Sequence, residues 1–357
     1  MIEGDASDDG SAATQHMRQT DGMAGVTGMV DARRASRAGL VVGLDVGGTK
    51  TLALLADTDG TALAQLRRPT GAGGPAALLT TVTEAVTGVV AEAVASGVSV
   101  AVGDVAAVGV GVPGLVDPVA GLVRHAVNLG IGGRPLDLAG PLGALIGGGP
   151  VVVGNDANLA ALGAADVLAA TGDVAYLSLG TGVAAGLVLQ GRIHVGALGL
   201  AGEIGHLPVD PYGPMCECGQ RGCLEVVASG QAIARRWPRP DGRPGDAGAL
   251  LAAALDGDER AIAVRDDVCM HIAAALALIA QTVDPEMLVL GGGVAEAGEL
   301  LLDAVRVALR RRAESVPLLA TLALEDRVRL VPAGVPVGAL GAVRAGRDAL
   351  AAAGGNR

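Results

Sequence analysis

Residues 40–56 read LVVGLDVGGTKTLALLA, which is two apolar runs on either side of a glycine pair. Short apolar runs bounded by turn residues are typical of buried strands. The turn signal DTDG follows at 57–60, and a third run covers 61–66. This stretch therefore predicts a three-stranded meander whose first turn carries polar residues. A helix at 75–96 and a strand at 105–112 are expected to follow.

The second half of the chain repeats the strand, glycine turn and strand. Apolar runs at 174–179 and 184–189 flank the turn GTG. A long Ala- and Leu-rich helix at 260–282 then leads to a strand at 287–290. Repetition of one unit within a chain indicates a duplicated fold. We expect an α/β protein whose two lobes face each other across a cleft, a common place for a ligand.

These patterns divide the chain into three parts. Residues 1–38 are rich in small residues and Met and have no sustained period. We expect them to be a disordered tail or an over-extended gene start. Residues 39–150 are expected to form the first lobe, completed by a C-terminal helix at 338–351. Residues 151–337 are expected to form the second lobe.

Composition restricts the class of partner. The chain has 357 residues, a net charge of −11 and no Phe. An acidic chain lacks the basic face that nucleic-acid binding requires. The longest apolar run, near 272–280, is shorter than the roughly 20 residues that span a bilayer, and no signal-peptide pattern is present at the start. We expect a cytoplasmic protein that handles small molecules, with no nucleic-acid or membrane partner.

Three glycine turns that follow strands are candidates for phosphate binding. In Asp45-Val46-Gly47-Gly48-Thr49-Lys50, glycine lets backbone N–H groups approach phosphate oxygens, while Thr49 and Lys50 add a hydroxyl and a cation. Asp45 is placed to hold Mg²⁺ through water. An ordinary Gly-Gly hairpin is the alternative. The other two candidates are Gly180-Thr181-Gly182 and Gly291-Gly292-Gly293, and the three turns together favour phosphate binding more than any one alone.

Asn155 and Asp156 directly follow the apolar run 151–153 and precede a helical stretch. Groups just past a strand end are where α/β proteins place catalytic side chains. An Asp there can act as a general base if it lies within hydrogen-bond reach of a substrate hydroxyl. Asn and Asp are also favoured helix N-caps, so a purely structural role is the alternative.

Residues 203–225 read EIGHLPVDPYGPMCECGQRGCLE and hold three of the four cysteines. Together with His206, the array Cys216, Cys218 and Cys223 matches the Cys3His set of a closed tetrahedral zinc site. A disulfide that leaves one cysteine over, or a packed core histidine, is the alternative. The fourth cysteine, Cys269, lies on the predicted long helix and is interpreted as a small buried hydrophobe.

In their order along the chain, these motifs resemble the ROK family of sugar kinases and repressors. The resemblance covers roughly residues 40–347, and its most specific part is EIGH followed by CxCGxxGCxE. It implies an actin-like ATPase fold of two ribonuclease-H-like lobes, with MgATP and a sugar meeting in the cleft. It also implies a homo-oligomer, either a dimer or a tetramer.

The resemblance implies a role for each motif. Asp156 would take the proton from the primary hydroxyl of the sugar, which then attacks the γ-phosphate. The residues on the sugar side would be Asn155, Glu203, His206, Glu225 and Gly114. His206 would use one ring nitrogen for a structural Zn²⁺ and the other for the sugar, since a metal-bound His has a fixed orientation. The glycine turns and Asp45 would hold ATP and Mg²⁺.

The reaction implied is ATP-dependent phosphorylation of a hexose, with glucose to glucose 6-phosphate expected first. N-acetylmannosamine, N-acetylglucosamine, fructose or allose are alternative substrates, and polyphosphate is an alternative donor. A repressor is disfavoured, because the 39 residues before Leu40 show no recognition-helix pattern. A sugar-binding protein without catalysis is disfavoured by the retained Asp45 and Asp156.

Two positions depart from the family pattern. Further glycines often follow GTG, whereas residues 182–186 read GVAAG. Alanine in place of a glycine with positive φ would cost about 1 kcal/mol and disturb the phosphate turn. The segment 128–133, NLGIGG, lacks a tryptophan common in relatives, which predicts a looser lip on the sugar side.

Overall fold

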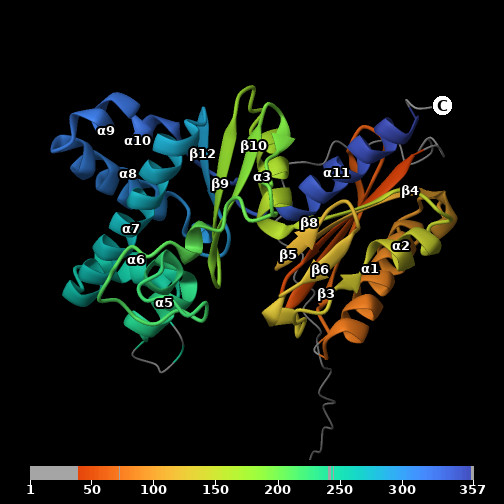
Figure 1. Cartoon of the computed structure of the whole chain (residues 1–357), viewed down its shortest axis with the longest axis horizontal. Coiled ribbons are helices and arrows are strands. Elements are labelled where there is room, and N and C mark those ends of the chain that lie inside the picture. Colours follow the sequence, from red (N-terminus) through yellow and green to blue (C-terminus); the bar gives the residue numbers. More distant parts are fainter. Residues whose placement is uncertain (1–38, 72, 240–242, 244, 355–357) are drawn as a thin grey trace, which may run out of the picture. The chain divides into compact units, whose positions relative to one another are not determined.

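The computed structural model describes residues 39–71, 73–239, 243 and 245–354. The expected tail at 1–38 lies outside the described residues. Two five-stranded sheets correspond to the two predicted halves of the chain (Figure 1).

The first sheet has the order β3-β2-β1-β4-β8. Its strands are β1 (Leu40–Val46), β2 (Lys50–Ala56), β3 (Ala62–Pro69), β4 (Val105–Val112) and β8 (Val151–Asn155). The first three strands pair antiparallel, which confirms the predicted meander, and β4 and β8 then join in parallel. Because β8 pairs with β4, this sheet extends to Asn155. The lobe boundary expected at residue 150 stays a prediction, and β8, which follows it, pairs with the first sheet.

The second sheet has the order β11-β10-β9-β12-β13. Its strands are β9 (Val174–Leu179), β10 (Val183–Leu189), β11 (Arg192–Ile193), β12 (Met287–Gly291) and β13 (Val328–Leu330). Again three antiparallel strands are followed by two parallel ones. The equal strand order of the two sheets confirms the predicted duplicated unit.

The other elements cover these sheets or connect them. A small sheet is formed by β5 (Leu115–Asp117), β6 (Leu122–Arg124) and β7 (Leu136–Asp137). The α-helices are α1 (Pro75–Ala95), α2 (Ala139–Leu145), α3 (Asp156–Val167), α4 (Leu224–Ala228), α5 (Gly230–Arg236), α6 (Ala247–Leu255), α7 (Glu259–Val283), α8 (Glu299–Glu314), α9 (Pro317–Leu322), α10 (Leu324–Arg327) and α11 (Val337–Gly354). Short 3₁₀ turns lie at Val102–Asp104, Val127–Leu129, Ile204–His206 and Ala295–Ala297.

Helix α1 covers one face of the first sheet. Its buried residues Leu78, Val82, Val86 and Val89 recur at helical spacing and pack over β2 and β3, as predicted. Among the described residues, α1 is also the one helix long and apolar enough to cross a membrane. Its apolar side belongs to the hydrophobic core of the first half, and this packing accounts for its composition.

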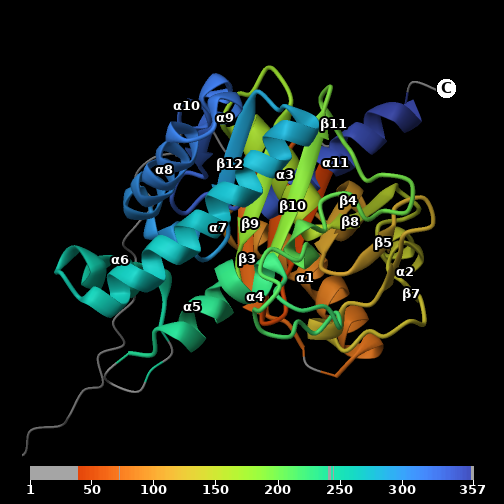
Figure 2. The same cartoon turned by 60° about the vertical axis from the view of Figure 1, so that its left-hand side comes forward.

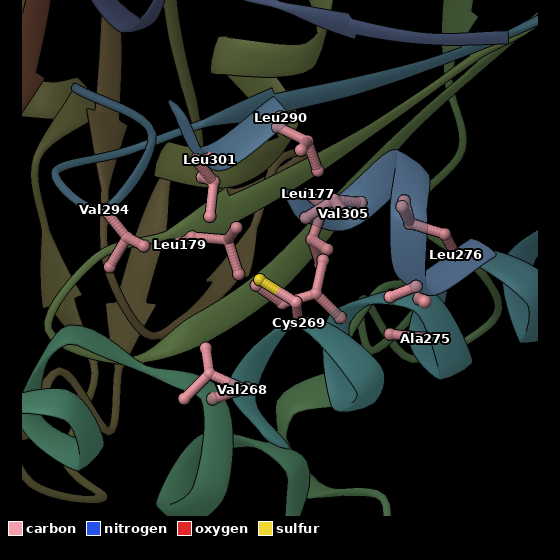
Figure 3. Close-up of a cluster of buried hydrophobic side chains, with 14 of the residues drawn as sticks. Leu177, Leu179, Val268, Cys269, Ala275, Leu276, Leu290, Val294, Leu301 and Val305 are labelled. Atoms are coloured by element: carbon pink, nitrogen blue, oxygen red, sulfur yellow. The ribbon is translucent and has the colours of Figure 1, made fainter. Parts of the chain in front are cut away.

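The core of the second half is aliphatic, as expected for a chain without Phe. Figure 3 shows Cys269 of α7 among Leu177 and Leu179 of β9 and Val305 of α8. Cys269 is 2% exposed, and burial raises the pKa of its thiol to about 12. The thiol therefore stays protonated and packs as the small hydrophobe that the sequence predicted.

Helices α3 and α11 lie between the two sheets (Figure 2). Helix α11 packs on β1 and β4, α3 packs on β9 and β10, and the two helices pack against each other. The C-terminal helix thus returns to the first sheet.

Glycine allows the close approach of these two helices. A Cβ on Gly341 would overlap the carbonyl oxygen of Leu159, and a Cβ on Gly163 would overlap that of Val337. Backbone therefore meets backbone at this crossing, which leaves no room for a side chain. Since α3 begins at Asp156, this packing also sets where that carboxylate lies.

Gly341→Ala is expected to lower the melting temperature, although alanine is normally the better helix former by about 1 kcal/mol. The added methyl must push α3 and α11 apart, and overpacking of a tight core costs about 1–3 kcal/mol. Gly248→Ala in α6 is the matched control, because its Cβ would meet no atom closer than 3.4 Å. Equal melting temperatures for the two variants in a thermal scan would contradict the close packing described here.

Candidate active site

A cleft of about 1010 Å³ is lined by elements of both sheets. Its walls are the β1–β2 turn, the start of α3, strand β9, the turn after β12 and the segment 331–338 that leads into α11. The predicted site residues that line it are Asp45, Gly47, Lys50, Asp156, Gly291, Gly292 and Gly293. The cleft therefore brings the candidate base together with the first and third glycine turns.

Asp45 and Asp156 lie at neighbouring strand ends. Parallel pairing places Asp45 opposite Gly111 and Gly111 opposite Gly154, so the ends of β1, β4 and β8 lie at one edge of the sheet. Asp156 is the first residue of α3, directly after β8. The local sequence predicted this position, and the parallel register explains why Asp45 comes to the same place.

Both carboxylates have a raised pKa. Burial raises the pKa of Asp156 to about 6, the neighbouring carboxylates of Asp45 and Glu203 add to the rise, and the backbone N–H of Ala157 opposes it. Burial likewise raises the pKa of Asp45, and Lys50 opposes that rise. A carboxylate whose pKa lies near 6 is suited to take a proton from a hydroxyl at neutral pH.

Asn155 is the N-cap of α3. Its Oδ1 accepts the backbone N–H groups of Ala157 at 2.9 Å and Asn158 at 3.3 Å. Its Nδ2 donates to the carbonyl oxygen of Gly114 at 3.3 Å. The capping alternative is therefore correct for Asn155. The same bonds hold the 111–114 loop against the start of α3.

The first two glycine turns differ in their relation to the cleft. Gly47 donates its N–H to the Lys50 carbonyl at 2.9 Å and lines the cleft, whereas Gly48 and Thr49 are exposed beside it. The second turn, Gly180-Thr181-Gly182, closes through Gly180 N–H to the Gly182 carbonyl at 3.0 Å and is not among the lining residues. All three turns were predicted to bind phosphate, and the residues that line the cleft come from the first and third.

The alanines after the second turn cause no backbone strain. Ala184 and Ala185 lie within β10, paired with Ser178 and Leu177. Neither is among the described residues with positive φ. The expected cost of replacing glycine at these positions is therefore absent, and this concern from the sequence was wrong.

Glu225 joins the cysteine loop to the second glycine turn. It lies in the first turn of α4, and its Oε2 accepts the Val183 N–H at 3.1 Å. A Cβ on Gly182 would overlap the same oxygen, so a larger residue there would displace the Glu225 carboxylate. Glu203 is partly buried, and burial raises its pKa, with His206 opposing and Glu225 adding to the rise.

His206, Cys216, Cys218 and Cys223 come together as the sequence predicted. Their ligand atoms all lie within 4.8 Å of one another. Cys216 Sγ is 3.6 Å from His206 Nδ1, and Cys218 Sγ is 3.6 Å from Cys223 Sγ. Bond lengths of about 2.1 and 2.3 Å in a tetrahedral zinc site give edges of roughly 3.6–3.8 Å. All four cysteines of the chain are free thiols, so the disulfide alternative is not realised. The side chains of His206 and the three clustered cysteines could hold a zinc ion.

Several lining residues were missed from the sequence. Tyr176 and Ser178 face the cleft from β9, and the segment Pro332–Gly338 forms a wall at the start of α11. The alternation along β9 could have placed Tyr176 and Ser178 on one face, but not which face meets the cleft. The Gly- and Pro-rich sequence PAGVP at 332–336 marks a turn, with no sign of a ligand.

Comparison with known proteins identifies close counterparts of this architecture. The model of the ROK family matches residues 41–343. A glucokinase from Halalkalibacterium halodurans is 35% identical over 286 residues, which are 74% of this chain and 83% of the relative.

Two solved structures show the same fold. A ROK hexokinase from Thermus thermophilus has a TM-score of 0.70 at 33% identity, covering 86% of this chain and 97% of that one. A ROK family glucokinase from Streptomyces griseus, in complex with glucose and AMPPNP, has a TM-score of 0.69 at 32% identity, covering 87% and 100%. With the equal strand order of the two sheets, these likenesses confirm the predicted actin-like ATPase fold.

Proposed function

The chain belongs to the ROK family, and we propose on that basis that it is an ATP-dependent hexose kinase that converts glucose to glucose 6-phosphate. The observation that carries this function is the partly buried Asp156, whose pKa lies near 6, in one cleft with Asp45 and two glycine turns. The likeness to glucokinases at 32–35% identity supports glucose as the substrate.

Asp156 acts as the general base in the proposed mechanism. The primary hydroxyl of the sugar donates a hydrogen bond to the carboxylate, and its proton moves to Asp156 as the hydroxyl oxygen forms a bond to the γ-phosphorus. The bond from that phosphorus to the β–γ bridging oxygen breaks, and ADP leaves. Phosphoryl transfer depends mainly on positioning and charge stabilisation, so the glycine turns and Lys50 complete the machinery by holding the phosphates.

The sugar wall is proposed to consist of Asn155, Glu203, His206, Glu225 and Gly114. Asn155 contacts Gly114 directly, and the pKa of Glu203 responds to both His206 and Glu225. These contacts support one continuous wall beside Asp156. The nucleotide side is proposed to consist of Asp45, Gly47, Gly48, Thr49, Lys50, Gly180, Thr181, Gly182, Gly291, Gly292 and Gly293.

Two metals fit the residues present. Asp45 is a partly buried carboxylate whose pKa Lys50 lowers, and its donor type suits Mg²⁺ held through water. Bound Mg²⁺ would shield the charge of the phosphates. The separations in the His206 and cysteine cluster suit a structural Zn²⁺. Because Nδ1 of His206 points into the cluster, Nε2 is left for the sugar.

We also propose the organisation of the molecule. Each five-stranded sheet is the centre of one lobe, and α11 completes the first. The enzyme is proposed to act in the cytoplasm as a dimer or tetramer without a nucleic-acid or membrane partner. The net charge of −11 supports the absence of a nucleic-acid partner.

A coupled assay of ADP release across a panel of hexoses and phosphate donors tests the function. The purified chain should release ADP only with Mg²⁺ and a hexose together, with the highest kcat/KM for glucose. The panel includes N-acetylmannosamine, N-acetylglucosamine, fructose and allose, with polyphosphate as a second donor. A higher kcat/KM for another of these would reassign the substrate, and no turnover with any would refute the kinase.

A further inference from the structure

Two buried threonine hydroxyls hold the first glycine turn without lining the cleft. Thr51 is 0% exposed and Thr70 is 9% exposed. Thr51 lies on β2, and Thr70 directly follows β3. Lys50 and Leu52 line the cleft, whereas Thr51 between them does not, as the alternation of side chains along a strand requires. Neither hydroxyl is therefore placed to touch a ligand in the cleft.

The hydrogen bonds of these hydroxyls run in one direction. Thr70 Oγ1 donates to the Gly47 carbonyl oxygen at 2.8 Å, and it lies 2.8 Å from Thr51 Oγ1. A hydroxyl has one proton to donate, and a carbonyl oxygen can only accept. Since the Thr70 proton is used on Gly47, the Thr51 hydroxyl has to be the donor to Thr70. Thr51 thus orients the Thr70 hydroxyl, which in turn holds the Gly47 carbonyl.

Thr70 also holds the turn through its backbone. Its N–H donates to the Thr49 carbonyl at 3.0 Å. The turn itself is closed by the Gly47 N–H, which donates to the Lys50 carbonyl at 2.9 Å. One residue outside the turn therefore engages two of its carbonyl groups, those of Gly47 and Thr49.

These bonds decide where the amide groups of the turn point. In a planar trans peptide, a carbonyl and the N–H of the next residue point in opposite directions. The Gly47 carbonyl points to Thr70, so the Gly48 N–H points away from it. Among the backbone hydrogen bonds of the described residues, the N–H groups of Gly48 and Thr49 donate to no carbonyl. Both residues are exposed, so these N–H groups are available to an acceptor outside the chain.

We propose that Thr70 is a positioning residue for the reaction: its hydroxyl, oriented by Thr51, keeps the Gly47 carbonyl turned away from the nucleotide and the Gly48 N–H turned toward it. This role rests on the proposed kinase function, in which the first glycine turn holds phosphates. A released Gly47 carbonyl could turn into the cleft, where its oxygen would repel a phosphate, whereas N–H groups attract one. Thr70 acts through the turn and contacts neither substrate.

Thr70→Val tests this role, because it replaces the hydroxyl by a methyl group of similar size. We expect KM for MgATP to rise about 10-fold with kcat within about threefold of the wild type, as when an interaction made in the ground state and the transition state alike is lost. Calorimetric affinity for MgAMPPNP should fall about 10-fold, the effect of roughly one hydrogen bond. The glucose dissociation constant should stay as in the wild type.

Three further variants separate the hydroxyl from packing. Thr70→Ser keeps the hydroxyl and should restore the KM for MgATP and the MgAMPPNP affinity. Thr51→Val removes the donor to Thr70 and should give a smaller loss of MgAMPPNP affinity. Thr83→Val in α1 is the matched control, because Thr83 Oγ1 also donates to a backbone carbonyl, that of Leu79 at 2.8 Å. It should leave the KM for MgATP unchanged.

The outcomes separate the role of Thr70 from the kinase function itself. Wild-type KM for MgATP and wild-type MgAMPPNP affinity in Thr70→Val would overturn the role while the kinase stands. Equal losses in Thr70→Val and Thr70→Ser would also overturn it, because the hydroxyl would not be the cause. An equal loss of glucose and MgAMPPNP affinity would overturn it in favour of a packing defect. If the wild type turns over no hexose, the MgAMPPNP calorimetry decides alone, by the same comparison of Thr70→Val with the wild type and Thr70→Ser.

Discussion

Asp156→Asn is expected to lower kcat by about 10³-fold, because it removes the carboxylate that is proposed to take the proton from the sugar hydroxyl. General-base catalysis of this kind contributes about 10²–10⁴-fold. Asparagine keeps the shape and can still accept the Ala157 N–H that Asp156 accepts at 2.9 Å. Glucose and MgADP should therefore bind with wild-type affinity in calorimetry, while the coupled assay shows the loss.

The same substitution should make the protein more stable. At pH 7 the carboxylate is ionised in the folded and the unfolded chain, and a pKa raised to about 6 means that ionisation costs the folded state on the order of 1–3 kcal/mol. That contribution is absent below pH 4 and develops as the pH rises from about 4 to 6. Asparagine removes it, so the melting temperature at pH 7 should rise. Loss of activity together with a lower melting temperature would indicate misfolding instead of a missing base.

The pH profile of the wild type provides an independent check on Asp156. The base works only when deprotonated, so kcat should fall as the pH drops through about 6. Burial contributes most to this raised pKa, the carboxylates of Asp45 and Glu203 add to it, and the Ala157 N–H opposes it. Asp166→Asn in the same helix is the control, because Asp166 pairs with Arg344 at 2.6 Å and is not among the residues that line the cleft. Its profile should match the wild type, and a full-rate Asp156→Asn enzyme would refute the assignment of the base.

Local sequence patterns predicted the strands and turns, whose formation depends on residues close in sequence. The apolar runs around Gly47 and around Thr181 gave the hairpins of both sheets within a few residues, since strand period and turn chemistry are local. The pairing of β8 with β4 could not be predicted from local patterns, because parallel pairing joins distant segments. Only the register of β1, β4 and β8 shows that Asp45 and Asp156 meet at one edge.

Site residues were predicted where the chemistry requires a short spacing in sequence, and they were missed where their position depends on tertiary packing. The cysteine array and His206 could be recognised because a tetrahedral metal site needs short intervals between ligands. Tyr176 could not, since a strand tyrosine is usually core and its cleft-facing hydroxyl depends on the turn at Gly291. The hydrogen bond from the Val183 N–H to Glu225 links residues 42 positions apart, so no local sequence pattern could predict it.

Replacing both Cys216 and Cys218 by Ser is expected to abolish zinc binding and to weaken glucose affinity by about 10–100-fold, the range seen when the support of a ligand shell is lost. The cluster fixes the loop that carries His206 and leads into Glu225, so the sugar wall loses its shape. Zinc content by elemental analysis and calorimetric affinities for glucose and MgADP are the measurements. Cys269→Ala is the control and should retain the zinc, because Cys269 lies in the core and outside the cluster.

Glu225 contacts Val183 beside the second glycine turn, so loss of the zinc loop could also affect nucleotide binding. The MgADP affinity of the double variant therefore decides whether the loop supports the sugar wall alone. If the loop serves the sugar wall, MgADP affinity should fall by no more than about tenfold, since one backbone hydrogen bond contributes only about 0.5–1.5 kcal/mol. The residues of the His206 and cysteine cluster are not among those that line the cleft with the first and third glycine turns. Removing the zinc with a chelator and then restoring Mg²⁺ should reproduce the double variant. An equal loss of glucose and MgADP affinity would show instead that the zinc loop supports the whole second lobe, through Glu225 and the β10 strand that it holds.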